Sequence, residues 1–225
     1  MKYIVLIPSY EPDDKLIELL KSIPKDMDII IVNDGSNESY DGVFKLAKKY
    51  GHVIAYKENK GKGYALKTGL KYIKDNYQDY IVVTMDGDLQ HDTSDAMKLM
   101  KYANIHNKVL VLGRRTWNKK TPIRSRIGNI ITRYVFYLKT GLKIYDTQTG
   151  LRAFSNNLTD YLLSIDGDRY DYEMNALLNL RENGIGYHEI PIKTIYINKN
   201  ETSHFKTIKD SYKIYKEIFK YKKTR

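Results

Sequence analysis

Residues 80–91 read Tyr-Ile-Val-Val-Thr-Met-Asp-Gly-Asp-Leu-Gln-His, an apolar run that ends in two carboxylates separated by one glycine. The apolar part predicts a strand. Because alternate residues of an extended segment point the same way, Asp86, Asp88 and Gln90 can converge on one point. Three oxygen ligands at the carboxyl end of a strand suit Mg²⁺ or Mn²⁺ carried on the phosphates of a substrate. The other interpretation is a plain Asp-Gly-Asp turn.

The segments around this stretch alternate between strand and helix patterns. Strands are expected at 3–7, 28–32, 53–56, 80–85 and 109–112, and helices at 13–22, 40–50, 63–77 and 94–105. This alternation predicts an α/β fold with a mostly parallel central sheet and helices on both faces. Polar clusters follow three of the strands, at 8–11, 33–36 and 86–88. Because ligands of such sheets bind beyond the carboxyl ends of the strands, the three clusters predict one site.

The second half of the chain has a different pattern. A helix is expected at 122–140 and a polar loop at 146–150, followed by a strand at 151–154. Helices at 158–163 and 172–183 and an extended segment at 187–197 complete it. We find no linker rich in Pro, Gly or Ser, so we expect the two halves to pack as one domain.

Composition narrows the class of protein. The chain has 225 residues, no cysteine and a net charge of +11. The lack of cysteine excludes a disulfide framework and thiol chemistry. The first residues enter a strand at once and become charged too soon for a signal peptide, and no uncharged stretch exceeds eight residues. We therefore expect a soluble or peripheral protein that attracts polyanions: nucleic acid, an anionic membrane or phosphorylated substrates.

Two further motifs each have a functional and a structural interpretation. Asp34 follows four apolar residues and could accept N–H groups of a nucleobase, or it could order the turn before the next helix. Lys62 lies between Gly61 and Gly63 at the start of a helix, where backbone N–H groups and the helix dipole favour phosphate. The spacing does not match a P-loop, and a structural turn is the alternative.

Several arginines and acidic residues in the second half of the chain also have both a functional and a structural interpretation. Arg114, Arg115, Arg124 and Arg126 could hold an anionic acceptor, because guanidinium groups bind phosphate oxygens in pairs, or they could form a solvated basic face. Asp171 and Glu173 could supply a general base or cap a helix.

The C-terminal segment, residues 203–225, carries eight Lys or Arg against two acidic residues. Its large apolar residues recur at helical spacing with lysines on the other side, which is typical of a helix that lies on an anionic membrane. The alternative is a terminal helix packed on the domain. The apolar positions are Phe205, Ile208, Tyr212, Tyr215 and Phe219.

Taken in order along nearly the whole chain, these motifs resemble the family-2 glycosyltransferases of the GT-A fold, which is Rossmann-like. Residues 86–91, 146–152 and 203–205 are most similar to the polyprenyl-phosphate hexose synthases, the group that includes dolichyl-phosphate mannose synthase. The segments that carry the resemblance are 7–11, 32–36, 59–63, 86–91, 146–152 and 203–205.

The resemblance implies domain boundaries and roles for individual residues. It implies one GT-A domain over 1–202, with a nucleotide-sugar-binding half at 1–113, an acceptor half at 114–202, and then the basic amphipathic helix at 203–225. Metal would be held by Asp86, Asp88 and Gln90, and acceptor phosphate by Arg115, Ser125 and Arg126. Asp86, Asp88, Arg115 and Arg126 would be the catalytic residues. Nucleotide-binding residues would be Pro8, Tyr10, Glu11, Asp34 (on the base), Lys62, Asp86 and Gly87.

The implied reaction is an inverting, Mg²⁺- or Mn²⁺-dependent transfer of a hexose from a UDP- or GDP-sugar to polyprenyl phosphate at the inner, cytoplasmic face of a membrane. Where dolichyl-phosphate mannose synthases carry Arg and Lys before the 203–205 segment, this chain offers Lys199 and His204. The C-terminal helix would dock on the anionic membrane or on a small integral membrane partner.

Two alternatives to this reaction stay open. One is a family-2 enzyme with a saccharide or cell-surface polymer as acceptor. The other is a non-catalytic module that binds a nucleotide sugar or nucleic acid. We expect no nucleic-acid partner, because strand-end carboxylates would repel nucleic-acid phosphates.

Overall fold

The computed structural model describes residues 1–116, 123–193, 195 and 207–221, and within these it describes no side chains for 123–125 and 207–211. The contacts expected of Arg124, Ser125, Lys199 and His204 lie outside the described side chains. The strands are β1 (Lys2–Ser9), β2 (Asp28–Asp34), β3 (His52–Tyr56), β4 (Tyr80–Thr84), β5 (Val109–Arg115), β6 (Arg152–Ser155) and β7 (Gly186–Ile192). The α-helices are α1 (Lys15–Ser22), α2 (Asp41–Ala47), α3 (Lys62–Asn76), α4 (Thr93–Ile105), α5 (Ile123–Thr140), α6 (Thr159–Ser164), α7 (Asp171–Leu178) and α8 (Thr207–Lys220). Two short 3₁₀ helices, η1 (Glu38–Tyr40) and η2 (Asn156–Leu158), precede α2 and α6.

The described strands form one sheet in the order β3-β2-β1-β4-β6-β5-β7. Neighbouring strands are parallel except at β6, which runs antiparallel to both β4 and β5. Strands β2 and β3 lie on one side of β1, and β4 and all later strands lie on its other side. The strand order therefore reverses between β1 and β4, and such a switch point opens a crevice at the carboxyl ends of the strands.

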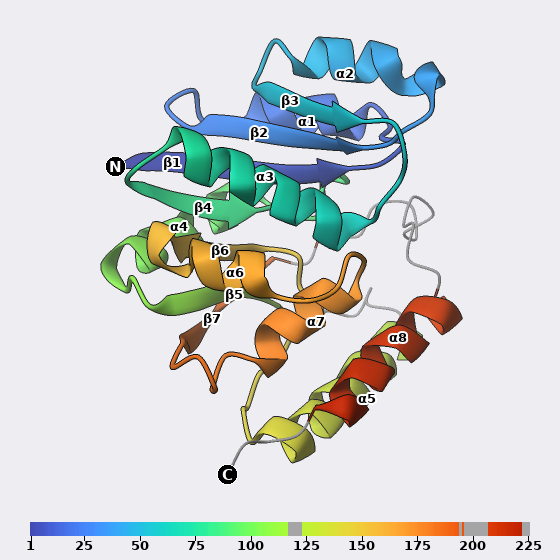
Figure 1. Cartoon of the computed structure of the whole chain (residues 1–225), viewed down its shortest axis with the longest axis vertical. Coiled ribbons are helices and arrows are strands. Elements are labelled where there is room, and N and C mark those ends of the chain that lie inside the picture. The colour runs from blue at the N-terminus through green and yellow to red at the C-terminus, as the bar shows by residue number, and fades with distance from the viewer. Residues whose placement is uncertain (117–122, 194, 196–206, 222–225) are drawn as a thin grey trace.

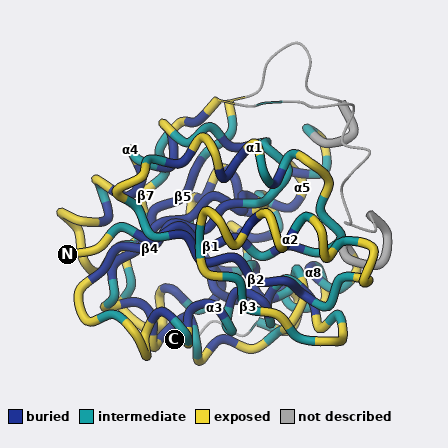
Figure 2. The backbone as a smooth tube through the Cα atoms, turned by 90° about the horizontal axis from the view of Figure 1, so that it is seen from above, coloured by how far each residue is buried: buried dark blue, intermediate teal, exposed yellow. Residues whose placement is uncertain are grey.

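Each strand divides its apolar side chains between two layers of helices. Because side chains alternate along a strand, Ile4 and Leu6 of β1 pack with α3, α6 and α7, whereas Val5 and Ile7 pack with α1, α2 and α4. Figure 1 shows α3, α6 and α7 in front of the sheet, and Figure 2 shows the buried strands lying between more exposed helices. The α/β fold with a mostly parallel sheet, expected from the alternating pattern, is confirmed.

Helices α5 and α8 lie side by side at one end of the molecule (Figure 1). Ile214 and Ile218 of α8 are buried in the same core cluster as residues of α6 and α7. The hydroxyls of Thr132 in α5 and Tyr215 in α8 are 3.0 Å apart and share a hydrogen bond. Within the described part of the chain, no helix has an apolar stretch long enough to cross a bilayer.

Candidate active site

The ends of β1, β2 and β4 meet at the switch point, and the backbone there is strained. Glu11 after β1 and Leu89 after β4 are the two non-glycine residues with positive φ among those the structure describes, at 47° and 61°. Such conformations cost free energy and persist where the surrounding structure enforces them. The N–H of Glu11 donates to Oγ of Ser36, which joins the loop after β1 to the loop after β2. The strain therefore coincides with the edge where the sequence predicts a site.

Lys62, the first residue of α3, lies between two carboxylates from distant parts of the chain. Its Nζ is 2.7 Å from Oδ1 of Asp86 and 3.0 Å from Oε2 of Glu173 in α7. Nε2 of His91 lies 3.7 Å from the other oxygen of Asp86. Lys62 and Glu173 are largely buried, with 16% and 12% of their side chains exposed. This cluster of one ammonium and two carboxylates joins the start of α3, the end of β4 and the start of α7.

The charges of this cluster stabilise one another. Burial opposes the Lys62 charge, but Asp86 and Glu173 outweigh it and raise the pKa of the ammonium above its ordinary value. Burial likewise disfavours the charged form of Asp86, yet Lys62 holds the pKa of that carboxyl well below its usual range. Lys62 is thus a fixed cation and Asp86 a fixed anion at neutral pH.

The loop at 146–150 covers this cluster closely at Gly150. A Cβ at position 150 would overlap the carboxylate of Asp86 and approach Nζ of Lys62. The carbonyl of Gly150 accepts a hydrogen bond of 2.8 Å from Oγ1 of Thr84, the last residue of β4. Only glycine allows the loop to lie this close to Asp86. The polar sequence of residues 146–150 predicts a loop, but nothing in it indicates this role of Gly150.

Asp34, at the end of β2, binds the loop that precedes α3. Its buried carboxylate accepts hydrogen bonds from the backbone N–H groups of Lys60 and Gly61, from Nδ2 of Asn59 and from the hydroxyl of Tyr56, at 2.7–3.1 Å. This is the turn-ordering role that the sequence leaves open beside base recognition. The contact of Asp34 with a nucleobase remains a prediction.

Arg115, at the end of β5, pairs with Asp146 at the start of the 146–150 loop. Nε and Nη2 of Arg115 lie 2.7 and 2.9 Å from the two oxygens of Asp146, which also accepts from Nδ2 of Asn129 in α5. The backbone N–H groups of Tyr145 and Asp146 donate to Glu189 of β7. Through Asp146, Arg115 therefore connects β5 to α5 and to the 146–150 loop. Its expected contact with acceptor phosphate remains a prediction, as does that of Arg126, a partly buried residue of α5.

The carboxylates after β4 fit a divalent cation. Burial, and then the nearby charge of Asp86, raise the pKa of Asp88, so the two carboxylates repel each other and a dication would relieve that repulsion. The backbone N–H of Gln90 donates to Asp88, which keeps the turn compact. No group of three or more acidic or histidine side chains spaced to hold a metal occurs among the described residues. A metal at this place would take its other ligands from Gln90, substrate phosphates and water.

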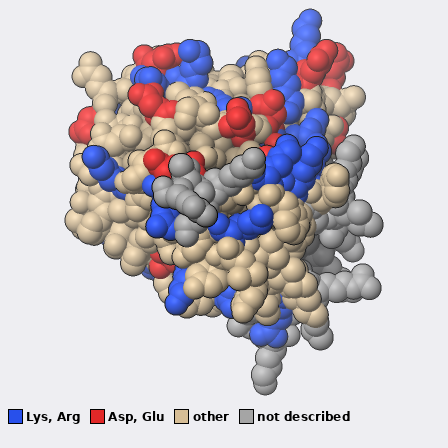
Figure 3. All heavy atoms as spheres, turned by 60° about the horizontal axis from the view of Figure 1, so that its bottom comes forward, with Lys and Arg blue, Asp and Glu red and all other residues tan. Residues whose placement is uncertain are grey.

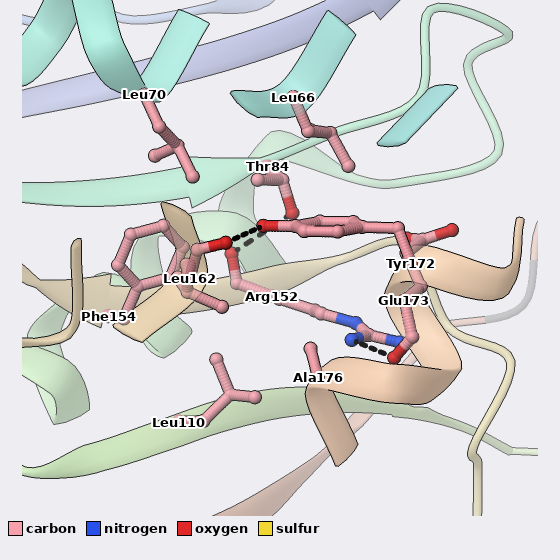
Figure 4. A pocket seen from close by; sticks show the side chains of 10 residues that line it. All are labelled: Leu66, Leu70, Thr84, Leu110, Arg152, Phe154, Leu162, Tyr172, Glu173 and Ala176. Carbon is pink, nitrogen blue, oxygen red and sulfur yellow. Dashed lines mark hydrogen bonds between the residues drawn. The ribbon is translucent and has the colours of Figure 1, made fainter. Parts of the chain in front are cut away.

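Arg152 and Glu173 are among the residues that line a cavity of about 20 Å³ (Figure 4). The Arg152 guanidinium donates to the carbonyls of Thr149 and Glu173, which ties the 146–150 loop to α7. Its buried Nη2 has no hydrogen-bond partner within the described part of the chain. The cavity has room for about one water and not for a nucleotide, so the donor would bind outside it, at the strand ends. The remaining residues predicted for the nucleotide, Pro8, Tyr10 and Gly87, are partly buried at those ends.

The sequence and the fold of the chain are similar to those of known proteins. The model of the family "Glycosyl transferase family 2" matches residues 4–172, which hold all but one strand of the sheet. The chain belongs to glycosyl transferase family 2. This family-2 glycosyltransferase is 31% identical over 217 residues to the UDP-N-acetylglucosamine–dolichyl-phosphate N-acetylglucosaminyltransferase of Methanococcus voltae, with 85% of each chain covered.

Two other similar proteins, one curated relative and one solved structure, extend the comparison. The chain is 28% identical over 173 residues to an undecaprenyl-phosphate 4-deoxy-4-formamido-L-arabinose transferase of Enterobacter sp. (strain 638), which covers 72% of this chain and 51% of that one. Its fold is similar to that of mannosyl-3-phosphoglycerate synthase from Rubrobacter xylanophilus, with a TM-score of 0.70 and 14% identity over 97% of this chain and 73% of that one. The GT-A fold and the resemblance to the polyprenyl-phosphate group are confirmed.

Proposed function

We propose that this family-2 glycosyltransferase moves a hexose from a UDP- or GDP-sugar to a polyprenyl phosphate, with inversion and with Mg²⁺ or Mn²⁺ as cofactor. The observation that carries the proposal is the cluster of Lys62, Asp86 and Glu173 at the switch point, with Asp88 beside it. Two relatives of the chain are named for dolichyl-phosphate and undecaprenyl-phosphate substrates, which supports the acceptor class.

The charges at the strand ends suit a nucleoside diphosphate. Lys62 offers a permanent cation beside Asp86, where the start of α3 also directs backbone N–H groups. A bound divalent metal would stabilise the charge that develops on the leaving diphosphate. Asp86 and Asp88 would hold this metal ion, and Gln90 of the same turn would be its third protein ligand. The chain itself orients the donor and brings its anomeric carbon to the acceptor.

The chemistry of the acceptor decides whether the site needs a base. In the transfer, an oxygen of the acceptor forms a bond to the anomeric carbon while the bond from that carbon to the diphosphate oxygen breaks. A lipid phosphate has a second pKa of about 6, so it attacks already largely deprotonated and needs only cations that hold it in line. Glu173, one of two bases considered from the sequence, is bound to Lys62. The other, Asp171, accepts from the backbone N–H of Arg169. Because both carboxylates already have partners within the protein, we favour an acceptor that is already an anion and needs no general base.

The membrane holds such an acceptor, so we propose that the enzyme works as a peripheral protein at the cytoplasmic face of an anionic membrane. The positive net charge of +11 would favour that surface. The proposed division of the chain is unchanged: donor residues within 1–113, acceptor residues within 114–202, and a basic helix in 203–225.

The test is a transfer assay with undecaprenyl phosphate, Mg²⁺ or Mn²⁺ and a panel of radiolabelled UDP- and GDP-sugars. We expect label in the organic phase with one donor and none with Asp88→Ala. The Asp92→Asn enzyme is the matched control: it changes an acidic residue of the same segment, and asparagine keeps the helix cap that Asp92 provides to Ser94.

The outcomes of the assay distinguish the claim about the donor site from the claim about the acceptor. If one donor is slowly hydrolysed but no lipid is labelled, the donor site stands and the acceptor class is wrong. Label on an added saccharide or polymer instead of the lipid would favour the alternative acceptor. If no donor is consumed with any acceptor or metal, the transferase proposal fails as a whole.

A further inference from the structure

Helix α5 exposes an unusual amount of apolar surface. Six large apolar side chains on it are 39–70% exposed, and together we call them the α5 stripe: Ile127, Ile130, Ile131, Tyr134, Tyr137 and Leu138. Elsewhere in the described residues, exposed large apolar side chains occur singly or in pairs on any one helix. Single exposed apolar residues are ordinary, whereas a contiguous group marks a surface that binds something.

The α5 stripe covers one side of the helix. At 3.6 residues per turn its six positions fall within about one third of the circumference. The opposite side faces the protein and holds Phe136 together with Asn129, Thr132 and Thr140, all buried. Three of these side chains make hydrogen bonds to the rest of the protein or along the helix: Nδ2 of Asn129 donates to Asp146, the hydroxyl of Thr132 bonds to that of Tyr215, and the hydroxyl of Thr140 donates to a backbone carbonyl. The helix is therefore held in this orientation by specific contacts, with its apolar side outward.

The borders of the α5 stripe are basic. Residues 123–140 include Arg124, Arg126, Arg133 and Lys139 and no acidic residue. Helix α8 beside it adds four lysines against two acidic residues, one of which, Glu217, pairs with Lys220. In Figure 3, which brings this end of the molecule forward, acidic side chains gather in the upper part of the view, and the lower part is mostly basic and uncharged. An apolar stripe between cations is complementary to the acyl boundary and the anionic headgroups of a membrane.

The apolar residues of α8 are less available for this role. Ile214 and Ile218 are buried in the domain core, which leaves Tyr212 and Phe219 as its exposed apolar side chains among those described. Phe219 lies against Lys139 of α5, with the ammonium 5.6 Å from the ring centre. Helix α8 thus supports α5, although the sequence alone points to the C-terminal segment as the membrane-docking element.

We infer that α5 is the membrane-docking surface of this protein and that the α5 stripe inserts into the headgroup region of an anionic bilayer. A second copy of the chain fits the stripe less well, because a symmetric contact would bring Arg126, Arg133 and Lys139 of both copies together. The inference deepens the proposed function and rests on its membrane-held acceptor. Through Asn129 and Asp146, α5 is also joined to the 146–150 loop over the candidate site.

The first test measures binding to vesicles that contain about 30% phosphatidylglycerol in phosphatidylcholine, by co-sedimentation. In one variant, Ile131→Ser, Tyr134→Ser and Leu138→Ser are combined. The control combines Leu46→Ser, Tyr50→Ser and Ile105→Ser, which removes the same three residue types from exposed sites on other elements. We expect the α5 variant to lose about tenfold or more in vesicle affinity and the control to bind like the parent protein.

The second test reports insertion directly. Because the chain has no cysteine, single Ile131→Cys and Ile105→Cys proteins can each carry one environment-sensitive fluorophore. Vesicles should shift the emission at position 131 to the blue and leave position 105 unchanged. Both measurements need no turnover, so they stand or fall independently of the transfer assay.

Three results would overturn the inference. The α5 variant could bind vesicles as tightly as the control, or the probe at position 131 could stay in water while the protein binds. A probe at 131 that is already shielded without vesicles, in a protein that sediments as a dimer, would assign the stripe to a second copy. Far-ultraviolet circular dichroism checks that each variant is folded.

Discussion

At the scale of single residues, the candidate site depends on a balance of charge. Lys62 carries one positive charge between Asp86 and Glu173, and no other lysine or arginine among the described residues lies within ion-pair distance of either carboxylate. Removing a cation from a largely buried cluster leaves its partners uncompensated, which costs far more than the pair contributes when intact. This imbalance can be measured separately from catalysis.

Lys62→Met should lower the free energy of unfolding by about 2 to 3 kcal/mol at pH 7, because two carboxylates would remain without their cation. Urea denaturation measures it. Lys71→Met is the matched control on the same helix, since the Lys71–Asp75 pair is exposed and 3.9 Å long; it should change stability by less than about 0.5 kcal/mol. Equal effects at the two positions would show that Lys62 is not balancing buried charge.

Gly150→Ala should reduce transfer activity and stability together. The added Cβ would overlap Asp86 and push the loop or the carboxylate away, at a cost of about 1 to 3 kcal/mol. Gly128→Ala is the control, because a Cβ at that position of α5 meets nothing within 4 Å; it should leave stability unchanged or raise it by up to about 1 kcal/mol. Thermal unfolding and the transfer assay give the two readouts, and a Gly150→Ala enzyme with parental activity would argue against the close approach.

At the scale of elements, buried side chains join pieces that are remote in sequence. Asp146 is 2% exposed and binds Arg115 of β5 and Asn129 of α5. Burial would raise the pKa of Asp146, but the Arg115 guanidinium and the hydrogen bonds hold it below its ordinary value. A lowered pKa means that this carboxylate stabilises the fold above about pH 4 and that the stabilisation fades as the pH falls through the lowered value.

Asp146→Asn should therefore cost about 3 kcal/mol at pH 7, and its deficit relative to the parent protein should shrink as the pH falls from 4 towards 2. Urea denaturation across that range measures it. Asp160→Asn removes an exposed partner of Lys74 and should change stability by less than about 0.5 kcal/mol. A deficit that stays constant with pH would mean that the charge of Asp146 plays no part.

Two adjacent residues test how α8 is held. Ile218 is fully buried and Phe219 is 61% exposed. Ile218→Ala should cost about 2 to 4 kcal/mol, whereas Phe219→Ala should cost less than about 1 kcal/mol. Chemical denaturation measures the free energy of unfolding of the two variants. The opposite order would place the exposed aromatic side of α8 against the domain.

At the scale of the whole molecule, donor binding should be visible as stabilisation of the fold. Two carboxylates supply only part of a metal's ligands, so neither metal nor nucleotide alone should raise the melting temperature much. Together, at about 100 times the dissociation constant, Mn²⁺ and UDP or GDP should raise it by roughly 5 to 10 °C. EDTA should reverse the shift, Asp88→Asn should abolish it, and Asp92→Asn should retain it. A full shift with nucleotide alone would contradict the metal-bridged site.

Much of this molecule follows from the sequence because the signals are local. The alternation of apolar strands and amphipathic helices indicates the class of fold, and residues 80–91 place two carboxylates at the end of a strand in any parallel α/β sheet. Lys62 and the 146–150 loop stand out in the sequence too. These features depend on the backbone geometry of short segments, which few residues determine.

Only the tertiary structure decides which distant segments meet. It inserts β6 antiparallel between β4 and β5, pairs Lys62 with Glu173, and commits Arg115 to Asp146. It also turns α5 so that Asn129, Thr132 and Phe136 face inward and the α5 stripe faces out. Periodicity shows that a helix has two sides, but not which side is buried, because that choice depends on partners such as Asp146 and Tyr215 that lie elsewhere in the chain.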